Sequence, residues 1–319
     1  MKKIVIYLIS IISILIQQQS FCQNNLKTEK NFLQMKEYIV AIGTTVNDTI
    51  ILNNKKTYVK KFVTIGTGLI TYIKIDSILI YSVVTAGHVI NFFKEKNVKN
   101  LYIRPSWADT IKTIDYWGIE IPLLNSDSTP NTFLFPDNEI DLGCILILEE
   151  YFNQVFIEKL TKDKLQVFPI NSMTIPFIGS QVWLFGYPDH IESSFQNEFL
   201  YNISTFKPAY IVWKPSLNMT NKDLYHITLM ESNATHGNSG GPVFYLSDKI
   251  ELVGILTGGY YEIDSVYLNN QPIIDSISKN ALVSKRRAGV SIIEKATYVK
   301  QLVQYVQKEV SLYIDGKHK

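Results

Sequence analysis

The sequence predicts an all-β protein, a barrel or sandwich of short strands, that ends in one helix. From Tyr38 onward, short apolar runs rich in β-branched and aromatic residues alternate with turn residues such as Asn53-Asn54 and Asp76-Ser77. Many short strands at this spacing are typical of a barrel or sandwich. Near the C-terminus the apolar residues instead recur on one face of a helix, namely Val299, Leu302, Val303, Val306 and Val310.

The expected strands can be taken in chain order. Those of the first part are Tyr38–Ile42, Thr49–Leu52, Tyr58–Ile65, Leu69–Ile75, Ile78–Val84 and Asn100–Ile103. Those of the second part include Gln181–Pro188, which ends in a Gly-Tyr-Pro turn, Ala209–Trp213, Leu224–Met230 and Gly289–Ile293. Gly66-Thr67-Gly68 interrupts one strand, and no Lys-Ser/Thr with a helix follows as a phosphate loop would need. We therefore expect a bulge or a close backbone approach there.

Residues 1–22 have the pattern of an export signal. Lys2 and Lys3 precede a 13-residue apolar stretch, Ile4 to Ile16. Such a stretch is too short to span a bilayer comfortably and is typical of a signal peptide. The pattern predicts an exported protein, periplasmic or secreted, with no stable membrane span once the signal is removed.

The end of this signal allows three outcomes. Ser20 and Cys22 are small residues that suit cleavage ahead of Gln23, which is the outcome we expect. Cys22 could instead be acylated as a lipid anchor, but the bulky Phe21 before it argues against that reading. The third outcome is an uncleaved anchor. Residues 23–36, which are polar and charged, are expected to be a loose leader with one helical turn at most.

Composition excludes several classes of protein. The 297 residues beyond the signal (319 − 22) suffice for one large β domain or two small ones. A net charge of +2 gives no electrostatic case for nucleic acid or an anionic membrane. Cys144 lies in an apolar run and is expected to be a buried small hydrophobe, with no partner for a disulfide after cleavage. His190 and His226 have no partner pattern, and no metal-ligand spacing occurs, so neither a metal nor a cofactor is expected.

A serine between glycines carries the first chemical signal, in Thr235-His236-Gly237-Asn238-Ser239-Gly240-Gly241-Pro242. Glycines let the backbone approach a substrate closely and present its amides. A serine there could attack a carbonyl while free amides receive the negative charge. The motif alone fits a glycine-rich hairpin turn equally well. It also matches the nucleophile elbow of α/β-hydrolases, but that fold needs a helix after the serine and a histidine downstream, whereas a strand-like run follows here.

A base and an orienting carboxylate are found upstream. His88 ends a β-rich stretch in Thr85-Ala86-Gly87-His88. Of three acids before the apolar run Leu142–Leu148, Asp141 directly adjoins it, so we expect Asp141 to be buried beside the histidine and to hold its tautomer. The order is His, Asp, Ser, with separations of 53 (141 − 88) and 98 (239 − 141) residues.

This order, with Thr-Ala-x-His, Asp-Leu and Gly-x-Ser-Gly-Gly-Pro as flanks, resembles the chymotrypsin/trypsin-like serine peptidases over roughly Tyr38 to Leu312. The resemblance implies two six-stranded antiparallel β-barrels, over 37–155 and 156–319, with a cleft between them. It also implies a C-terminal α-helix packed on the second barrel. Together these form one peptidase domain.

The resemblance further implies a serine endopeptidase that works through an acyl-enzyme. Ser239 would attack, His88 would transfer its proton and Asp141 would orient His88. The N–H groups of Gly237 and Ser239 would form the oxyanion hole. The alternative is a catalytically latent trypsin-like domain that serves as a protein-binding module, although such a module has no need for an intact triad.

Some positions depart from the pattern. Asn238 stands where trypsin has an aspartate that pairs with a new N-terminus, so activation by that route is not expected. Gly87 stands where alanine is common, a change that we expect to have no effect. Gly-Asn-Ser-Gly-Gly-Pro is most similar to the bacterial HtrA-like branch, yet the stretch after Ile293 is too short for the PDZ domain of that branch.

The same resemblance locates the substrate pocket. Its expected walls are Asn233, Ala234, Thr235, His236, Thr257, Gly258 and Gly259. Because none of these carries a fixed charge, small or medium uncharged side chains are the expected preference, in a protein or peptide substrate. The oligomeric state stays open.

Overall fold

The computed structural model describes residues 28–52, 55–111, 116–163, 166–188, 203–216, 219, 224–232, 234–265, 267–268, 271–272 and 283–316. The expected export signal, Cys22, His190 and Asn233 lie outside these residues. Within the described ranges, no helix is both long enough and apolar enough to cross a bilayer.

The first half of the fold is an antiparallel sheet of seven strands in the order β5-β4-β1-β2-β3-β7-β6. Its strands are β1 (Ile39–Leu52), β2 (Lys55–Ile75), β3 (Ile78–Ala86), β4 (Asn100–Pro105), β5 (Ile119–Pro122), β6 (Thr132–Leu134) and β7 (Leu142–Ile147). Helical segments beside it are α2 (Gly87–Glu95), η1 (Ser106–Thr110), η2 (Glu149–Tyr151) and α3 (Gln154–Asp163).

The second half is a closed six-stranded barrel in the order β10-β15-β12-β11-β8-β9. Its strands are β8 (Gln181–Gly186), β9 (Thr205–Trp213), β10 (Ile227–Glu231), β11 (Pro242–Leu246), β12 (Ile250–Ser265) and β15 (Val283–Lys295). The short strands β13 (Tyr267–Leu268) and β14 (Gln271–Pro272) pair with each other, and the C-terminal helix is α4 (Ala296–Ile314).

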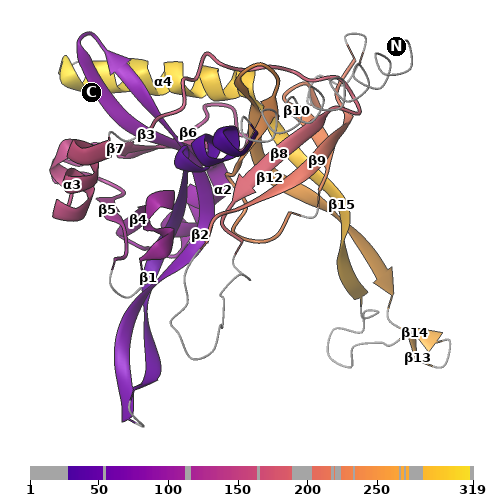
Figure 1. The fold of residues 1–319 in the computed structure, drawn as a ribbon, viewed down its shortest axis with the longest axis horizontal. Coiled ribbons are helices and arrows are strands. Elements are labelled where there is room, and N and C mark those ends of the chain that lie inside the picture. Colours follow the sequence, from indigo (N-terminus) through magenta and orange to yellow (C-terminus); the bar gives the residue numbers. More distant parts are fainter. Residues whose placement is uncertain are drawn as a thin grey trace, which may run out of the picture.

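The two halves lie side by side (Figure 1), and the predicted trypsin-like plan of two antiparallel β units followed by a helix is confirmed. The first half differs in detail from the expected six-stranded barrel, because its pairing of seven strands runs from β5 to β6 without closing among the described residues. The second half is the closed six-stranded barrel that was expected.

The first hairpin is longer than the sequence predicted. Four expected strands are merged into two, β1 and β2, which pair from Ile39↔Leu69 out to Leu52↔Lys55. Asn47-Asp48, a turn signal in the sequence, lies inside β1 because β2 supplies a partner at every position there. The register shifts by one residue at Ile42/Gly43, opposite Gly66, and this is the bulge expected beside Gly66-Thr67-Gly68. The far end of the hairpin projects from the body of the protein (Figure 1).

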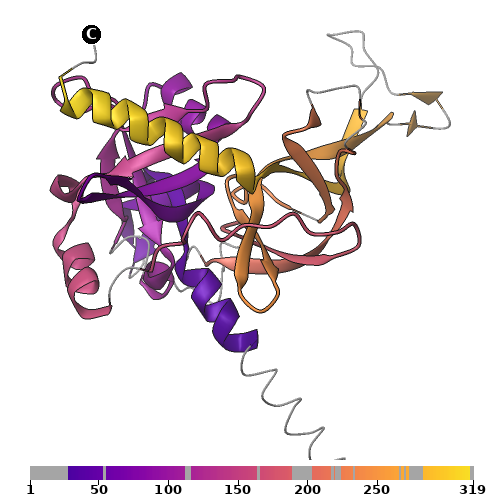
Figure 2. The same cartoon turned by 90° about the horizontal axis from the view of Figure 1, so that it is seen from above.

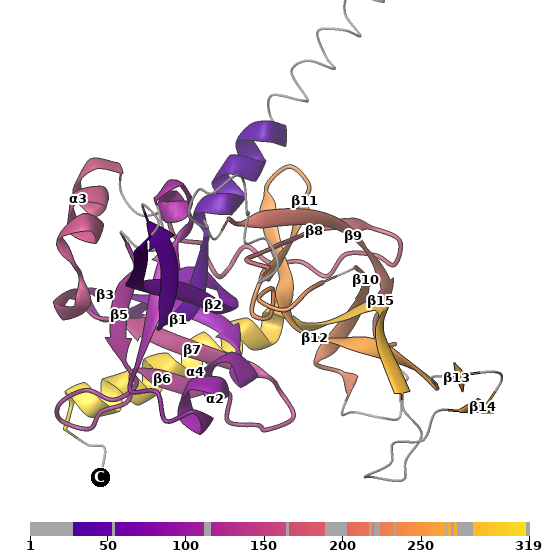
Figure 3. The ribbon, with the colours of Figure 1, turned by 90° about the horizontal axis from the view of Figure 1, so that it is seen from below.

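The C-terminal helix buries the predicted face. All five residues of that face are buried, and they are Val299, Leu302, Val303, Val306 and Val310. The helix packs on β12 and β15 of the second barrel, as the resemblance implied, and it also contacts β2 and β7 of the first half. Figures 2 and 3 show the helix crossing from one half to the other, so it holds them together.

The leader is more ordered than expected. Residues 28–37 form a helix rather than a loose segment. Phe32 packs against the second half, with its ring centroid 4.5 Å from that of Trp183 and 4.8 Å from that of Phe206. The aromatic contacts explain the difference, because a polar segment with one well-placed phenylalanine can be anchored by tertiary packing.

Cys144 is fully buried in β7, as predicted. Burial raises the pKa of its thiol to about 12. The cysteine therefore serves as a core residue and not as a nucleophile.

Candidate active site

The register of two strands brings His88 and Asp141 together. Strands β3 and β7 pair so that Ala86 lies opposite Leu142. The chain leaves β3 directly into α2, whose second residue is His88, and it enters β7 directly after Asp141. Residues 53 positions apart are therefore neighbours at one edge of the first half.

Asp141 contacts His88 at two points. Its Oδ2 lies 2.6 Å from Nδ1 of the imidazole, and its Oδ1 accepts the main-chain N–H of His88 at 2.8 Å. The main-chain oxygen of Asp141 in turn accepts the N–H of Gly87 at 3.1 Å. A carboxylate on Nδ1 keeps the ring proton there, which leaves Nε2 with a free lone pair as a base requires.

The His88–Asp141 pair is more exposed to solvent than predicted. The side chain of Asp141 is 36 % exposed and that of His88 is 47 % exposed, whereas we expected a buried carboxylate. The adjoining run Leu142–Ile147 is fully buried, but Asp141 stands at its solvent end. Of the two residues, His88 lines the cavity that also borders Ser239.

Gly87 is not interchangeable with alanine, contrary to the sequence-based expectation. A Cβ at this position would lie 2.9 Å from Oδ1 of Asp141 and 3.3 Å from the main-chain oxygen of Leu142. Because Oδ1 is held by the His88 N–H, it could move only at the expense of that hydrogen bond. The glycine allows Asp141 to approach the start of α2 closely.

Ser239 follows a tight turn. The N–H of Asn238 donates to the oxygen of Thr235 at 3.2 Å, and Gly237 has φ 81°. A positive φ at the third residue defines a type II turn, for which glycine is favoured. Among the described residues, neither the N–H of Gly237 nor that of Ser239 has a hydrogen-bond acceptor. These are the two amides expected to receive the oxyanion.

The turn is fastened to the first half by Thr67, which is fully buried. Its N–H donates to the oxygen of Ser239 and its Oγ1 donates to the oxygen of Gly237, both at 2.7 Å. The same Oγ1 accepts the N–H of Tyr187 at 2.9 Å. Both carbonyls that flank Asn238 are therefore fixed. The amide of Ser239 shares its peptide plane with the carbonyl of Asn238, which accepts the N–H of Gly241 at 2.8 Å, so the direction of that amide is fixed as well.

Asn238 lies inward from this turn and is 1 % exposed. Its Nδ2 donates to Oγ1 of Thr235 at 3.1 Å, and a Cβ added at Gly186 would meet its Oδ1 at 2.4 Å. The amide thus closes the turn through a neutral hydrogen bond. A new N-terminus is not needed for that contact.

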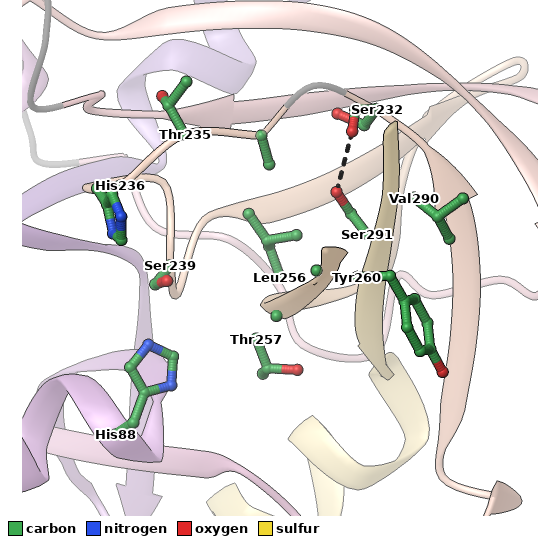
Figure 4. Close-up of a pocket in the computed structure, with 13 residues that line it drawn as sticks. His88, Ser232, Thr235, His236, Ser239, Leu256, Thr257, Tyr260, Val290 and Ser291 are labelled. Atoms are coloured by element: carbon green, nitrogen blue, oxygen red, sulfur yellow. Dashed lines mark hydrogen bonds between the residues drawn. The ribbon is translucent and has the colours of Figure 1, made fainter. Parts of the chain in front are cut away.

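A cavity of about 340 Å³ lies between the halves, and both His88 and Ser239 line it (Figure 4). Six of the seven expected pocket residues line it, namely Ala234, Thr235, His236, Thr257, Gly258 and Gly259. The seventh, Asn233, lies outside the described residues. The sequence reasoning did not identify five further lining residues, which are Ser232, Leu256, Tyr260, Val290 and Ser291. Ser291 is 52 residues (291 − 239) from the serine motif, and no local pattern marks it.

Ser239 and His88 face the same cavity without a direct hydrogen bond among the described residues. Such bonds are often long before a substrate binds and tighten in the complex. None of the thirteen lining residues carries a carboxylate, an ammonium or a guanidinium group.

One pair was missed entirely. We found no partner pattern for His226 in the sequence, yet its Nδ1 lies 2.6 Å from Oε2 of Glu294. The two residues are 68 positions apart, and Glu294 directly precedes Lys295 at the end of β15. The register Ile227↔Glu294 places them together, and that register is not evident from the sequence.

A seven-stranded antiparallel sheet beside a closed six-stranded barrel, with a C-terminal helix and a cavity between the halves, corresponds to the trypsin-like double-barrel fold. The sequence matches no protein-family model and no curated protein. Among solved structures, the chain is similar to the inactive form of the Rv3671c protease of M. tuberculosis H37Rv, at 14 % identity and a TM-score of 0.41 over 85 % of this chain and 89 % of that one. It is also similar to the apo protease domain of MamO from Magnetospirillum magneticum, at 12 % identity and a TM-score of 0.44 over 85 % of this chain and 97 % of that one.

Proposed function

We propose that this chain is an exported serine endopeptidase with the catalytic triad His88, Asp141 and Ser239. The observation that carries the proposal is the two-point contact of Asp141 with His88, at 2.6 and 2.8 Å, on the wall of a cavity that also contains Ser239. A histidine held in this way has its Nε2 available as a base, and a serine is the nucleophile that needs one.

In the proposed acylation, Oγ of Ser239 bonds to the carbonyl carbon of the substrate while Nε2 of His88 takes the hydroxyl proton. The C–N bond of the peptide then breaks, and His88 gives the proton to the departing amine. Water, deprotonated by His88, then bonds to the acyl carbon; the ester bond to Oγ of Ser239 breaks, and His88 returns the proton to Oγ as the carboxylic acid product leaves. Asp141 stays ionised throughout and stabilises the imidazolium through Nδ1.

The unpaired amides of Gly237 and Ser239 support an oxyanion hole. They belong to a turn in which Thr67 already binds the main-chain oxygens of Gly237 and Ser239. The turn therefore needs little reorganisation when negative charge develops on the substrate oxygen. One such donor contributes about 3 kcal/mol to transition-state stabilisation.

The cavity supports a preference for uncharged side chains next to the scissile bond. Its inner wall holds Leu256, Val290 and two serines, Ser232 and Ser291, which are linked by a 3.3 Å hydrogen bond from Oγ of Ser291 to the oxygen of Ser232. A lysine, arginine, aspartate or glutamate of the substrate would lose its hydration there without gaining an opposite charge. Peptide-library cleavage should therefore favour small or medium uncharged residues.

The decisive experiment is labelling of the purified protein with a fluorophosphonate probe, beside a Ser239→Ala control. The probe requires an activated serine and a formed oxyanion hole but no knowledge of the substrate. We expect labelling of the parent protein alone. If folded parent protein stays unlabelled, the peptidase assignment fails and the barrel pair is better regarded as a latent, protein-binding module.

Export is the part of the proposal that rests on sequence alone. Lys2, Lys3 and the apolar stretch that follows support a signal peptide. Cell fractionation of the full-length chain tests this, because an exported protein should leave the cytoplasm and lose mass.

A further inference from the structure

A second histidine–carboxylate pair lies behind the first. Glu294 is 2 % exposed, and its Oε2 is 2.6 Å from Nδ1 of His226, whose side chain is 13 % exposed. The main chain holds His226 in place, because the N–H of Lys295 donates to its oxygen at 3.0 Å. Nδ1 carries a proton in this contact whether the imidazole is neutral or charged, since a carboxylate can only accept.

The other oxygen of Glu294 is directed at the proposed triad. Oε1 accepts the main-chain N–H of Asp141 at 3.3 Å, across the interface between the two halves. That distance is at the long end of the hydrogen-bond range, and the bond is strengthened when the acceptor is ionised. Glu294 therefore joins His226 in the second half to Asp141 in the first.

All the polar groups of Asp141 are thereby occupied. Its two carboxylate oxygens contact His88, its main-chain oxygen accepts from Gly87, and its N–H donates to Glu294. The first three contacts lie within the first half. Among the described residues, the hydrogen bond with Glu294 is the one contact that ties the orientation of Asp141 to the barrel that would provide the nucleophile.

We propose that Glu294 is a positioning residue for the triad, acting through the main chain of Asp141, and that His226 holds its carboxylate in place. This inference rests on the proposed function of the same site. Glu294 does not touch the reacting atoms. Its hydrogen bond keeps Asp141 at the start of β7 in register with His88, and in its ionised form the carboxylate would also favour a positive charge on His88.

The surroundings of Glu294 contain few other titratable groups. Those that interact with it are His226, Asp141, Lys295 and Tyr298. Burial raises the pKa of Glu294, and the contacts with His226 act in the opposite direction. Burial also lowers the pKa of Lys295, while Glu294 opposes this shift. The contact with His226 therefore favours the ionised form of Glu294, against the effect of burial.

A buried ion pair is poor evidence of stability, because well-packed apolar residues often stabilise as much. A role in packing alone also does not explain why Oε1 of Glu294 accepts the main-chain N–H of Asp141, which belongs to the other half. The direction of Oε1 is what favours a positioning role over a structural one.

The test uses the full chain and two variants, Glu294→Leu, which removes the acceptor and the charge, and Glu294→Gln, which keeps the acceptor alone. Asp109→Asn is a matched control, since Asp109 is 5 % exposed and is bonded to Tyr187 and Lys36 but, among the described residues, to no member of the triad. Two readouts are taken: the fluorophosphonate labelling rate, and the titration midpoint of His88 by nitrogen-15 NMR. The chain has five histidines, and His88→Gln identifies the signal.

We expect Glu294→Leu to slow labelling at pH 7 by about tenfold, by analogy with the loss of residues that orient metal ligands. Glu294→Gln should keep the rate within about threefold of the parent, and both variants should lower the His88 midpoint. Asp109→Asn should leave that midpoint unchanged. A folded Glu294→Leu that labels at the rate of Asp109→Asn overturns the inference, and so does an unchanged midpoint in folded Glu294→Gln if Glu294→Leu does not fold. Because NMR needs no reactivity, a parent protein that fails to label but whose His88 midpoint depends on Glu294 would contradict only the proposed peptidase function.

Discussion

Replacing Asp141 by asparagine removes one hydrogen-bond acceptor from a residue that needs two. Oδ1 accepts the main-chain N–H of His88 at 2.8 Å, and Oδ2 lies 2.6 Å from Nδ1. An asparagine side chain has one oxygen and one amino group. If its oxygen remains on the main-chain N–H, the amino group faces Nδ1, so the ring proton must move to Nε2 and His88 can no longer act as a base.

The opposite orientation of the asparagine is no better. Its amino group would then face the N–H of His88, and two donors would meet. In the first orientation His88 therefore loses the tautomer with a proton on Nδ1, and in the second its main-chain N–H loses its hydrogen-bond acceptor. For the triad template, the loss of the right tautomer lowers turnover by about 10⁴-fold, or roughly 5 kcal/mol. We expect a loss of that order here at neutral pH, with little change in the fold because the two side chains have the same shape.

The assay compares fluorophosphonate labelling rates of the parent, Asp141→Asn and Asp137→Asn. Asp137 is an exposed acid on the same loop, where it accepts the N–H of Glu139 at 3.0 Å, and its replacement makes the same change of charge. The control should label at the parent rate. If folded Asp141→Asn labels within about tenfold of the parent, Asp141 does not set the tautomer of His88 and the reasoning from its two contacts is refuted.

Three further outcomes are expected. Gly240→Ala should destabilise the protein by more than about 3 kcal/mol in denaturant unfolding, because φ is 85° and the Cβ would lie 2.0 Å from a threonine oxygen of the other half. Gly179→Ala, at φ 87° with nothing within 4 Å, should cost only about 1–2 kcal/mol, and equal losses would contradict the steric argument. Cys144 should resist thiol reagents at pH 8 until the protein unfolds, since burial holds its pKa at about 12 against an ordinary value of 9.0; rapid reaction of folded protein would show that the strand opens. Intact mass of exported protein should correspond to a chain that begins at Gln23, whereas a lipid-modified Cys22 or an unprocessed chain would give a larger mass.

Features with a local signal could be predicted from the sequence. The buried face of α4 follows from residues spaced at helical intervals, and the bulge beside Gly66 follows from a glycine inside a strand. The association of His88 with Asp141 was predicted because short motifs mark each residue in a known order. Six residues of the cavity were implied by the resemblance to trypsin-like peptidases, which places the pocket on two chain segments near Ser239.

Features that depend on register or on docking could not be predicted. Asn47-Asp48 has the composition of a turn, and only the presence of an opposing strand, β2, makes it part of β1. The helix at 28–37 is held by Phe32 against aromatic residues more than a hundred positions away. His226 has no local partner, since Glu294 reaches it through strand pairing. In each case the deciding energy comes from a tertiary contact that a short sequence window does not contain.

Thr67 shows why the reacting residues were easier to find than the residues that hold them. A nucleophile or base must have a particular chemistry, so few residue types can fill the position and the sequence marks it. A positioning residue needs only a donor and an acceptor in the right place, and threonine supplies both while resembling any other strand residue. Yet its contacts with Ser239, Gly237 and Tyr187 all cross from the first half to the second. The oxyanion turn can therefore take its final form only when the two halves dock, and the proposed activity becomes a property of their interface.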